Sequence, residues 1–154
     1  MPRLNDLNQI RLSKHFMLSE FECKGKACCH YSVKLVPSLL TVLELIRNYV
    51  NAALNDPARP YRILLVSGYR CPEHNKRIGG VDNSYHVQGR AADLKCPGLK
   101  KERLAGLVRE LCESGIFPFR VGFYRKTFMG IEHHVLHIDV GEGQKVFGDA
   151  WGDV

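Results

Sequence analysis

The stretch NSYHVQGRAADL, residues 83–94, places His86 and Asp93 on either side of a run of small residues. On its own it is consistent with an ordinary turn that leads into a strand. It is equally consistent with a metal site, because small residues such as Gly89 would let a loop and a strand bring two ligands to one ion. The remainder of the sequence has to distinguish between these two interpretations.

Apolar residues recur at three- and four-residue spacing in two segments and form short runs in others, which predicts two helices and four strands. The helices are expected at 37–54 and 99–114, and the strands at 61–67, 89–94, 119–124 and 132–140. Gly115 stands where a C-cap glycine belongs, residues 68–83 are expected to form a long polar loop, and residues 127–130 a turn. Because helices and strands are partly segregated, we expect the α+β class, with a small, mainly antiparallel sheet flanked by helices.

The chain has 154 residues, of which 45% are hydrophobic and 25% charged, a composition typical of one globular domain. Its formal charge of +6 favours an acidic polymer or surface as a partner, and an anionic cell wall is one such surface. The sequence shows no long Lys/Arg run and no interleaving of basic and aromatic residues, so we do not expect a nucleic-acid partner.

The first twenty residues lack the apolar core of a secretory signal, and no run approaches the roughly 18 apolar residues of a membrane span. We therefore expect a protein that is made in the cytoplasm without a signal peptide and does not cross a membrane.

Histidines concentrate in the segment EHHVLHID, residues 132–139. In an extended strand, alternate residues share a face. His133, His137 and Asp139 would then lie on one side of the strand, and Leu136 and Ile138 would face the core. One face of this strand is therefore a candidate surface for metal binding and for acid–base chemistry.

Zinc in catalytic sites takes three protein ligands, from imidazole nitrogens and carboxylate oxygens, and one water. His86, Asp93 and His137 supply such a set. The acidified water also needs a general base. By residue type the candidates for this base are Asp139, Glu132 and His134.

The six cysteines are Cys23, Cys28, Cys29, Cys71, Cys96 and Cys112. Without a secretory signal, free thiols or metal ligands are expected in preference to a disulfide framework. The cluster at 23–30 does not follow the paired CxxC order of a standard zinc site. Free thiols, one disulfide to Cys71 and a second, structural metal remain alternatives.

Three motifs together resemble one known family. They are SGYR at 67–70, S-x-H-x-x-G-x-A-x-D at 84–93 and H-x-D at 137–139. The combination is similar to the zinc D-alanyl-D-alanine peptidases of the cell wall, which are grouped with the hedgehog signalling domain, and especially to the branch of murein hydrolases and phage lysins. The resemblance covers about residues 16–141. It implies a single peptidase domain over 1–154 with an arm at 1–15, a tail at 142–154 and the hedgehog-like peptidase fold.

The resemblance also implies roles for individual residues. His86, Asp93 and His137 match the three ligands of one catalytic zinc ion. Arg70 matches an arginine that holds a substrate carboxylate or polarises the substrate carbonyl, which suits a guanidinium fork. Ser84 matches a position that contacts substrate.

The general base is where the sequence departs from the family. Some members carry Glu or Asp three residues before the last histidine ligand, a position that His134 occupies here. Asp139, which matches the aspartate of the H-x-D motif, ranks first as the base, followed by Glu132 and His134. An alternative role for Asp139 is to orient His137 through a hydrogen bond.

Two further residues are candidates for contact with the substrate. Tyr85 stands where glutamine is usual in the family, and we expect it to alter substrate contacts rather than the metal. His133 is a candidate for the cleft wall, because it shares the parity of His137.

The resemblance implies a zinc peptidase that cuts peptidoglycan stem peptides or their cross-links, either as a D-Ala-D-Ala carboxypeptidase or as a murein endopeptidase. A non-catalytic module that binds the wall or a partner protein on the same zinc-containing fold is the alternative, and a nucleic-acid-binding protein with a cysteine knuckle is a distant third. We expect a monomer that reaches the wall by phage-type release or within a virion, with intracellular recycling of wall peptides also open.

Overall fold

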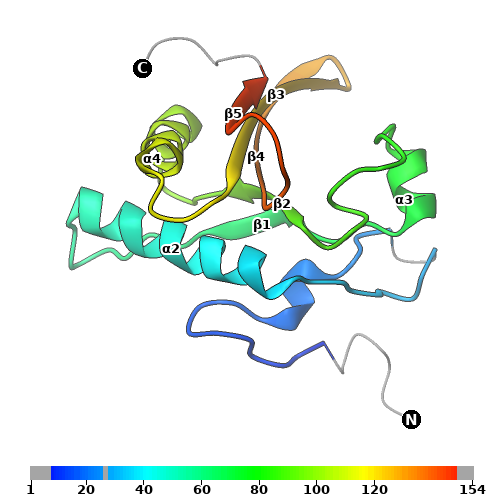
Figure 1. Cartoon of the computed structure of the whole chain (residues 1–154), viewed down its shortest axis with the longest axis horizontal. Coiled ribbons are helices and arrows are strands. Elements are labelled where there is room, and N and C mark those ends of the chain that lie inside the picture. The colour runs from blue at the N-terminus through cyan, green and yellow to red at the C-terminus, as the bar shows by residue number, and fades with distance from the viewer. Residues whose placement is uncertain (1–7, 26–27, 149–154) are drawn as a thin grey trace.

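The computed structural model describes residues 8–25 and 28–148, and its centre is a five-stranded sheet with strand order β1-β2-β4-β3-β5 (Figure 1). The elements in chain order are η1 (Leu18–Phe21), α2 (Pro37–Leu54), β1 (Leu64–Ser67), α3 (Pro72–Arg77), β2 (Ala91–Lys95), α4 (Lys101–Ser114), β3 (Arg120–Phe128), β4 (Ile131–Asp139) and β5 (Val146–Gly148). Neighbouring strands are antiparallel except for β3 and β5, which are parallel. The predicted α+β class with a mainly antiparallel sheet is confirmed.

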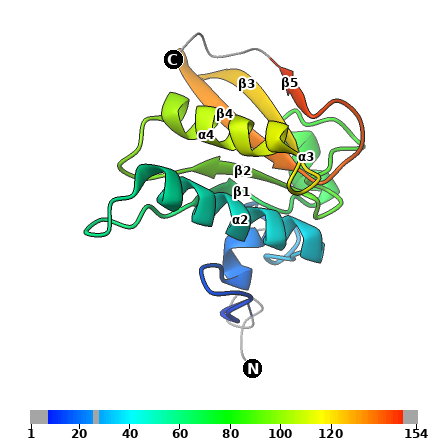
Figure 2. The same cartoon turned by 60° about the vertical axis from the view of Figure 1, so that its left-hand side comes forward.

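The helices α2 and α4 lie side by side over one face of the sheet (Figure 2). Pro37 occupies the first turn of α2, where its missing N–H costs no hydrogen bond. Asn55, in the left-handed conformation, ends this helix. Gly115 ends α4 with φ 71°, as the sequence predicted for a C-cap glycine. Among the described helices, none is long and apolar enough to cross a membrane.

Side chains of β4 alternate between the two faces of the sheet. Leu136 and Ile138 are buried in the core beneath the helices. His137 and Asp139 point to the opposite face, as the alternation in the sequence predicted. The sheet therefore has one face that packs on helices and one that carries polar groups.

The structure differs from the sequence-based prediction in four places. β3 continues to Phe128, beyond the expected end at residue 124, so that only residues 129–130 remain of the turn expected at 127–130. The strand expected at 61–67 forms only over Leu64–Ser67. The expected polar loop contains α3, a six-residue helix that is too short to show apolar periodicity. The tail contributes β5, whose three residues pair with β3, so that its conformation depends on a distant segment. The remaining tail, including Trp151, lies outside the described residues.

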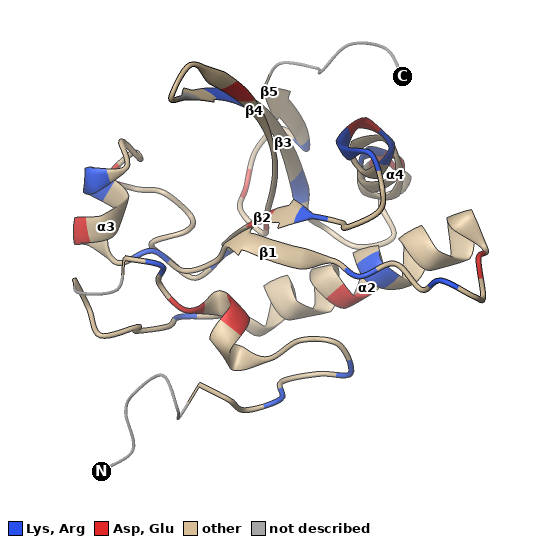
Figure 3. Cartoon of the chain, turned by 180° about the vertical axis from the view of Figure 1, so that it is seen from behind, with Lys and Arg blue, Asp and Glu red and all other residues tan. Residues whose placement is uncertain are grey.

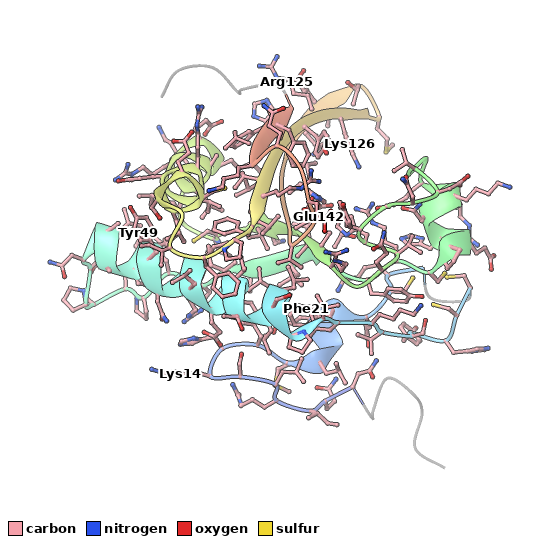
Figure 4. The ribbon with its side chains drawn as sticks, viewed as in Figure 1. Lys14, Phe21, Tyr49, Arg125, Lys126 and Glu142 are labelled. Carbon is pink, nitrogen blue, oxygen red and sulfur yellow. The ribbon has the colours of Figure 1, made fainter. Side chains whose placement is uncertain are left out.

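The N-terminal segment packs beneath α2 and reaches the start of the polar face. Phe16 and Phe21 are fully buried, and Figure 4 labels Phe21 beneath α2. The backbone N–H of Tyr69 donates to the carbonyl of Phe21 at 2.9 Å. This contact ties the N-terminal segment to the loop that follows β1.

Candidate metal centre

His86, Asp93 and His137 meet on the polar face of the sheet. His86 lies in the loop before β2, and the strand register sets Asp93 of β2 opposite His137 of β4. His86 Nε2 and His137 Nδ1 are 3.2 Å apart, and they lie 3.3 and 3.1 Å from Asp93 Oδ1. All three side chains are buried. The structure thus brings together the three residues that the sequence singled out as ligands.

The hydrogen bonds behind these atoms show that the group fits a cation. His86 Nδ1 lies 2.8 Å from the carbonyl oxygen of Gly68, which accepts only, so this nitrogen carries the proton. His137 Nε2 lies 2.9 Å from Asp139 Oδ2 and likewise donates. The other ring nitrogens of the two neutral imidazoles, together with Asp93 Oδ1, are then three converging acceptors with no proton between them. Such a set suits zinc, which takes imidazole nitrogen and carboxylate oxygen.

The charge states of the buried groups agree with this reading. Burial alone would raise the pKa of the Asp93 carboxyl, but contacts with His137 and His86 outweigh it and hold the pKa far below its usual range. Burial lowers the pKa of His137, but its contacts with Asp139 and Asp93 outweigh this and raise it. The carboxylate is therefore ionised at neutral pH, and a metal at this site would compete with a proton for Nδ1 of His137.

Arg70 supports the second oxygen of Asp93. Its Nη2 donates to Asp93 Oδ2 at 2.7 Å, and its Nε donates to Ser67 Oγ at 2.8 Å. The backbone N–H of Arg70 donates to the carbonyl of His86 at 3.2 Å. Arg70 also lines a depression of about 210 Å³ that reaches His86, Asp93 and His137. The SGYR motif therefore holds two of the three converging residues.

Asp139 is fully buried, and hydrogen bonds engage both of its oxygens. Arg120 donates to Oδ1 from Nε at 2.7 Å and to Oδ2 from Nη2 at 2.9 Å, and the N–H of Gly141 donates to Oδ1 at 2.9 Å. Burial opposes ionisation of Asp139, but His137 and Arg120 outweigh it and hold the pKa of this carboxyl well below its usual range. This environment suits a residue that orients His137.

Glu132 and His134 lie on the opposite face of β4, toward α4. His134 Nε2 is 3.1 Å from Glu132 and its Nδ1 is 3.7 Å from Glu102 of α4. The structure therefore separates these two base candidates from the three converging residues. His133 does share the polar face, but it lies four positions, about 13 Å, along the strand from His137. It lines a further depression, which Lys126, His134 and Asp93 also line.

Ser84 and Tyr85 flank the converging residues on the loop before β2. Ser84 Oγ accepts from the N–H of His86 at 3.2 Å. The ring of Tyr85 packs against the guanidinium groups of Arg90 and Arg120. Both residues line a depression of about 310 Å³ beside His137.

No sequence motif predicted three of the residues in this region. Tyr124 and Phe147 pack edge-on against His137, with ring centroids 5.8 and 5.9 Å away, and Arg120 holds Asp139. The pairing of β3 with β4 could have placed Tyr124 on the polar face. Phe147 lies on β5, which the sequence did not predict.

Gly122 lies opposite His137 in the β3–β4 register. A Cβ built on it would lie 2.7 Å from the ring of Phe147. We expect Gly122→Ala to lower the free energy of unfolding by about 1–3 kcal/mol, because the rings around His137 must shift. Urea unfolding measures this change. Gly106→Ala on α4 is the control, since nothing lies within 4 Å of the added Cβ; it is expected to stabilise the chain by about 0.5–1 kcal/mol. Equal effects of the two variants would contradict the tight packing at Gly122.

Comparison with known proteins agrees with this geometry. No curated protein matches the chain. A model of the peptidase M15 family matches residues 14–138, which include all three converging residues and the SGYR loop. The chain therefore belongs to the peptidase M15 family, the zinc D-alanyl-D-alanine peptidase family that its motifs resemble.

Proposed function

We propose that this zinc peptidase hydrolyses peptidoglycan stem peptides or their cross-links, with one zinc ion held by His86, Asp93 and His137. The observation that carries the proposal is the convergence of three potential donor atoms in one depression, beside a second depression that His137 also lines. When bound there, zinc would polarise the scissile carbonyl and acidify the attacking water. The M15 family supplies the class of reaction.

The charge around the depressions supports an acidic peptide as substrate. Arg70 and Lys126 line the smaller depression and Arg120 lines the larger. Figure 4 labels Lys126 on the side of the β3–β4 hairpin that faces α3. Stem peptides carry several free carboxylates, which these cations would attract. Elsewhere, Lys and Arg are spread over the N-terminal segment, α3, α4 and β3 and form no single stripe (Figure 3).

The residues around the ligands would orient the ligands or contact the substrate. Arg70 would hold Asp93 in place and present its remaining N–H groups to a substrate carboxylate or carbonyl. Ser84 and Tyr85 would contact the peptide from the loop. Asp139 would keep the Nε2 proton of His137 in place, so that Nδ1 faces the metal. The protein would meet such a substrate at the wall, after phage-type release or in a virion, or as wall fragments inside the cell.

Tyr124 is a further candidate for contact with the reacting carbonyl, because it lines both depressions and packs on His137. We expect Tyr124→Phe to lower kcat/KM about tenfold, the loss of one hydrogen bond of about 1.4 kcal/mol. The zinc content should not change, because the ring remains. Steady-state kinetics on a synthetic stem peptide measure the loss. Unchanged kinetics would show that the hydroxyl takes no part.

The experiment that tests the proposal is digestion of purified muropeptides followed by mass spectrometry. Loss of one D-alanine from pentapeptides indicates a carboxypeptidase, whereas conversion of cross-linked dimers to monomers indicates an endopeptidase. His137→Ala, purified in the same way, is the control and should leave both substrates intact. The proposal fails if zinc-loaded wild type leaves all muropeptides uncut, or if His137→Ala cuts them equally well.

A non-catalytic module that binds the wall is the second candidate. The observation that favours it is the placement of the three base candidates: Asp139 is saturated with hydrogen bonds, and Glu132 and His134 face α4. Co-sedimentation with purified sacculi, without release of any product, would support this candidate. Release of D-alanine or of monomeric muropeptides would exclude it.

A further inference from the structure

A second group of potential metal ligands lies outside the peptidase centre. Cys23 follows η1, Cys28 and Cys29 lie in the next loop, and Cys71 directly follows Arg70 as the N-cap of α3. The Sγ atoms of these four cysteines lie within 4.8 Å of one another. Residues 48 positions apart in the chain therefore contribute sulfur atoms to one small volume.

Cys28 lies at the centre of this group. Its Sγ is 3.2 Å from that of Cys71, 3.8 Å from that of Cys29 and 4.0 Å from that of Cys23. In a tetrahedral zinc site with Zn–S bonds of about 2.3 Å, the sulfurs are about 3.8 Å apart. The observed spacings scatter around this value. A disulfide between Cys28 and Cys71 would use two of the four sulfurs and leave the other two pointing at it.

Two backbone N–H groups donate to sulfurs of this group. The N–H of Cys71 lies 3.4 Å from Cys23 Sγ, and the N–H of His74 lies 3.3 Å from Cys71 Sγ. Burial raises the pKa of Cys23, and the hydrogen bond with Cys71 raises the pKa of Cys28 to about 12, so a metal would have to displace the protons of both thiols. Cys23 and Cys71 are buried, so that two of the four sulfurs are shielded from solvent.

We propose that Cys23, Cys28, Cys29 and Cys71 bind a structural zinc ion that is distinct from the ion of the peptidase centre. The four thiols would lose their protons on binding and form a closed Cys₄ site, with no open position for water.

The four cysteines lie where a bound metal would link two segments of the chain. The site joins the N-terminal segment to the loop after β1, alongside the hydrogen bond from Tyr69 to Phe21. That loop supplies the Gly68 carbonyl, which accepts from His86, and the Arg70 guanidinium, which holds Asp93. A metal at the four cysteines would therefore fix the loop that orients two ligands of the peptidase centre.

Zinc content of the purified full-length protein, measured by elemental analysis with a reductant present throughout, tests the proposal. Two zinc ions per chain are expected in wild type, one in His86→Ala, one in Cys28→Ser and none in the variant that combines both substitutions. Cys112→Ala is the matched control, because this buried cysteine of α4 lies outside the cluster, and it should keep both ions.

X-ray absorption on the His86→Ala variant identifies the remaining ligands without depending on the folding of a cysteine variant. Four sulfurs at about 2.3 Å are expected around zinc. If wild type holds one zinc ion per chain and His86→Ala holds none, the Cys₄ site is overturned, whereas the assignment of zinc to the peptidase centre stands. A Cys28–Cys71 disulfide in the mass spectrum of the non-reduced protein would also overturn the Cys₄ site. Wild-type protein that holds both zinc ions but cleaves no peptide would contradict the proposed function and leave the Cys₄ site unaffected.

Discussion

Replacing Asp93 with alanine is expected to remove zinc from the peptidase centre, abolish hydrolysis and lower the free energy of unfolding by about 3–5 kcal/mol. The effect is large because the two oxygens of Asp93 have different tasks. Oδ1 faces His86 and His137, whereas Oδ2 accepts from Arg70 at 2.7 Å. Alanine would leave the guanidinium of Arg70, which is 6% exposed, without its charged partner.

Urea unfolding in the presence of a chelator separates the contribution of the Arg70–Asp93 ion pair to stability from that of metal binding. His86→Ala also loses the metal and the activity, but it keeps the pair between Arg70 and Asp93, so it should unfold at a higher urea concentration than Asp93→Ala. Combining Arg70→Met with Asp93→Ala should recover part of the lost stability, because the buried charge without a partner is gone. Equal midpoints for the two single variants would show that the pair contributes nothing beyond the metal site. Undiminished zinc binding in Asp93→Ala would exclude the carboxylate as a ligand.

The fold and the converging residues could be predicted because local patterns encode them. The alternation in β4 placed Leu136 and Ile138 in the core and His137 on the other face, and burial of the apolar set fixes that register. The spacing of apolar residues predicted α2 and α4, and the motifs named His86 and Asp93. Each of these inferences depends on residues close together in the chain.

What the sequence left open depends on contacts between distant segments. Whether Asp139 acts as a base or as a positioning residue depends on Arg120, 19 positions away on a neighbouring strand. Phe147 packs on His137 only because β5 pairs with β3. The cysteine cluster lacks the CxxC spacing because Cys71 completes it from another loop. No local period carries this information, so the assembled fold was needed to reveal it.

Asp139→Asn is expected to lower zinc affinity and peptidase activity together by about 10–100-fold, the usual cost of disturbing a group that orients a metal ligand. The asparagine would retain the shape but lose the charge that Arg120 and His137 share. The amide N–H₂ of the asparagine would face another donor in either orientation. Arg120 and Gly141 donate at the position of Oδ1, and His137 donates at the position of Oδ2. Zinc affinity by competition with a chromogenic chelator and kcat/KM on a stem peptide are the two measurements.

The same variant distinguishes a positioning residue from a general base. A base would leave zinc affinity and KM unchanged while kcat fell to background, and the acid limb of the pH–rate profile would disappear. A positioning residue moves zinc affinity and keeps the shape of the profile. Glu132→Gln is the matched control on the same strand, and it should change activity by no more than about twofold, because this side chain is exposed and pairs with His134. Loss of activity in Glu132→Gln with the zinc retained would instead make Glu132 the proton acceptor.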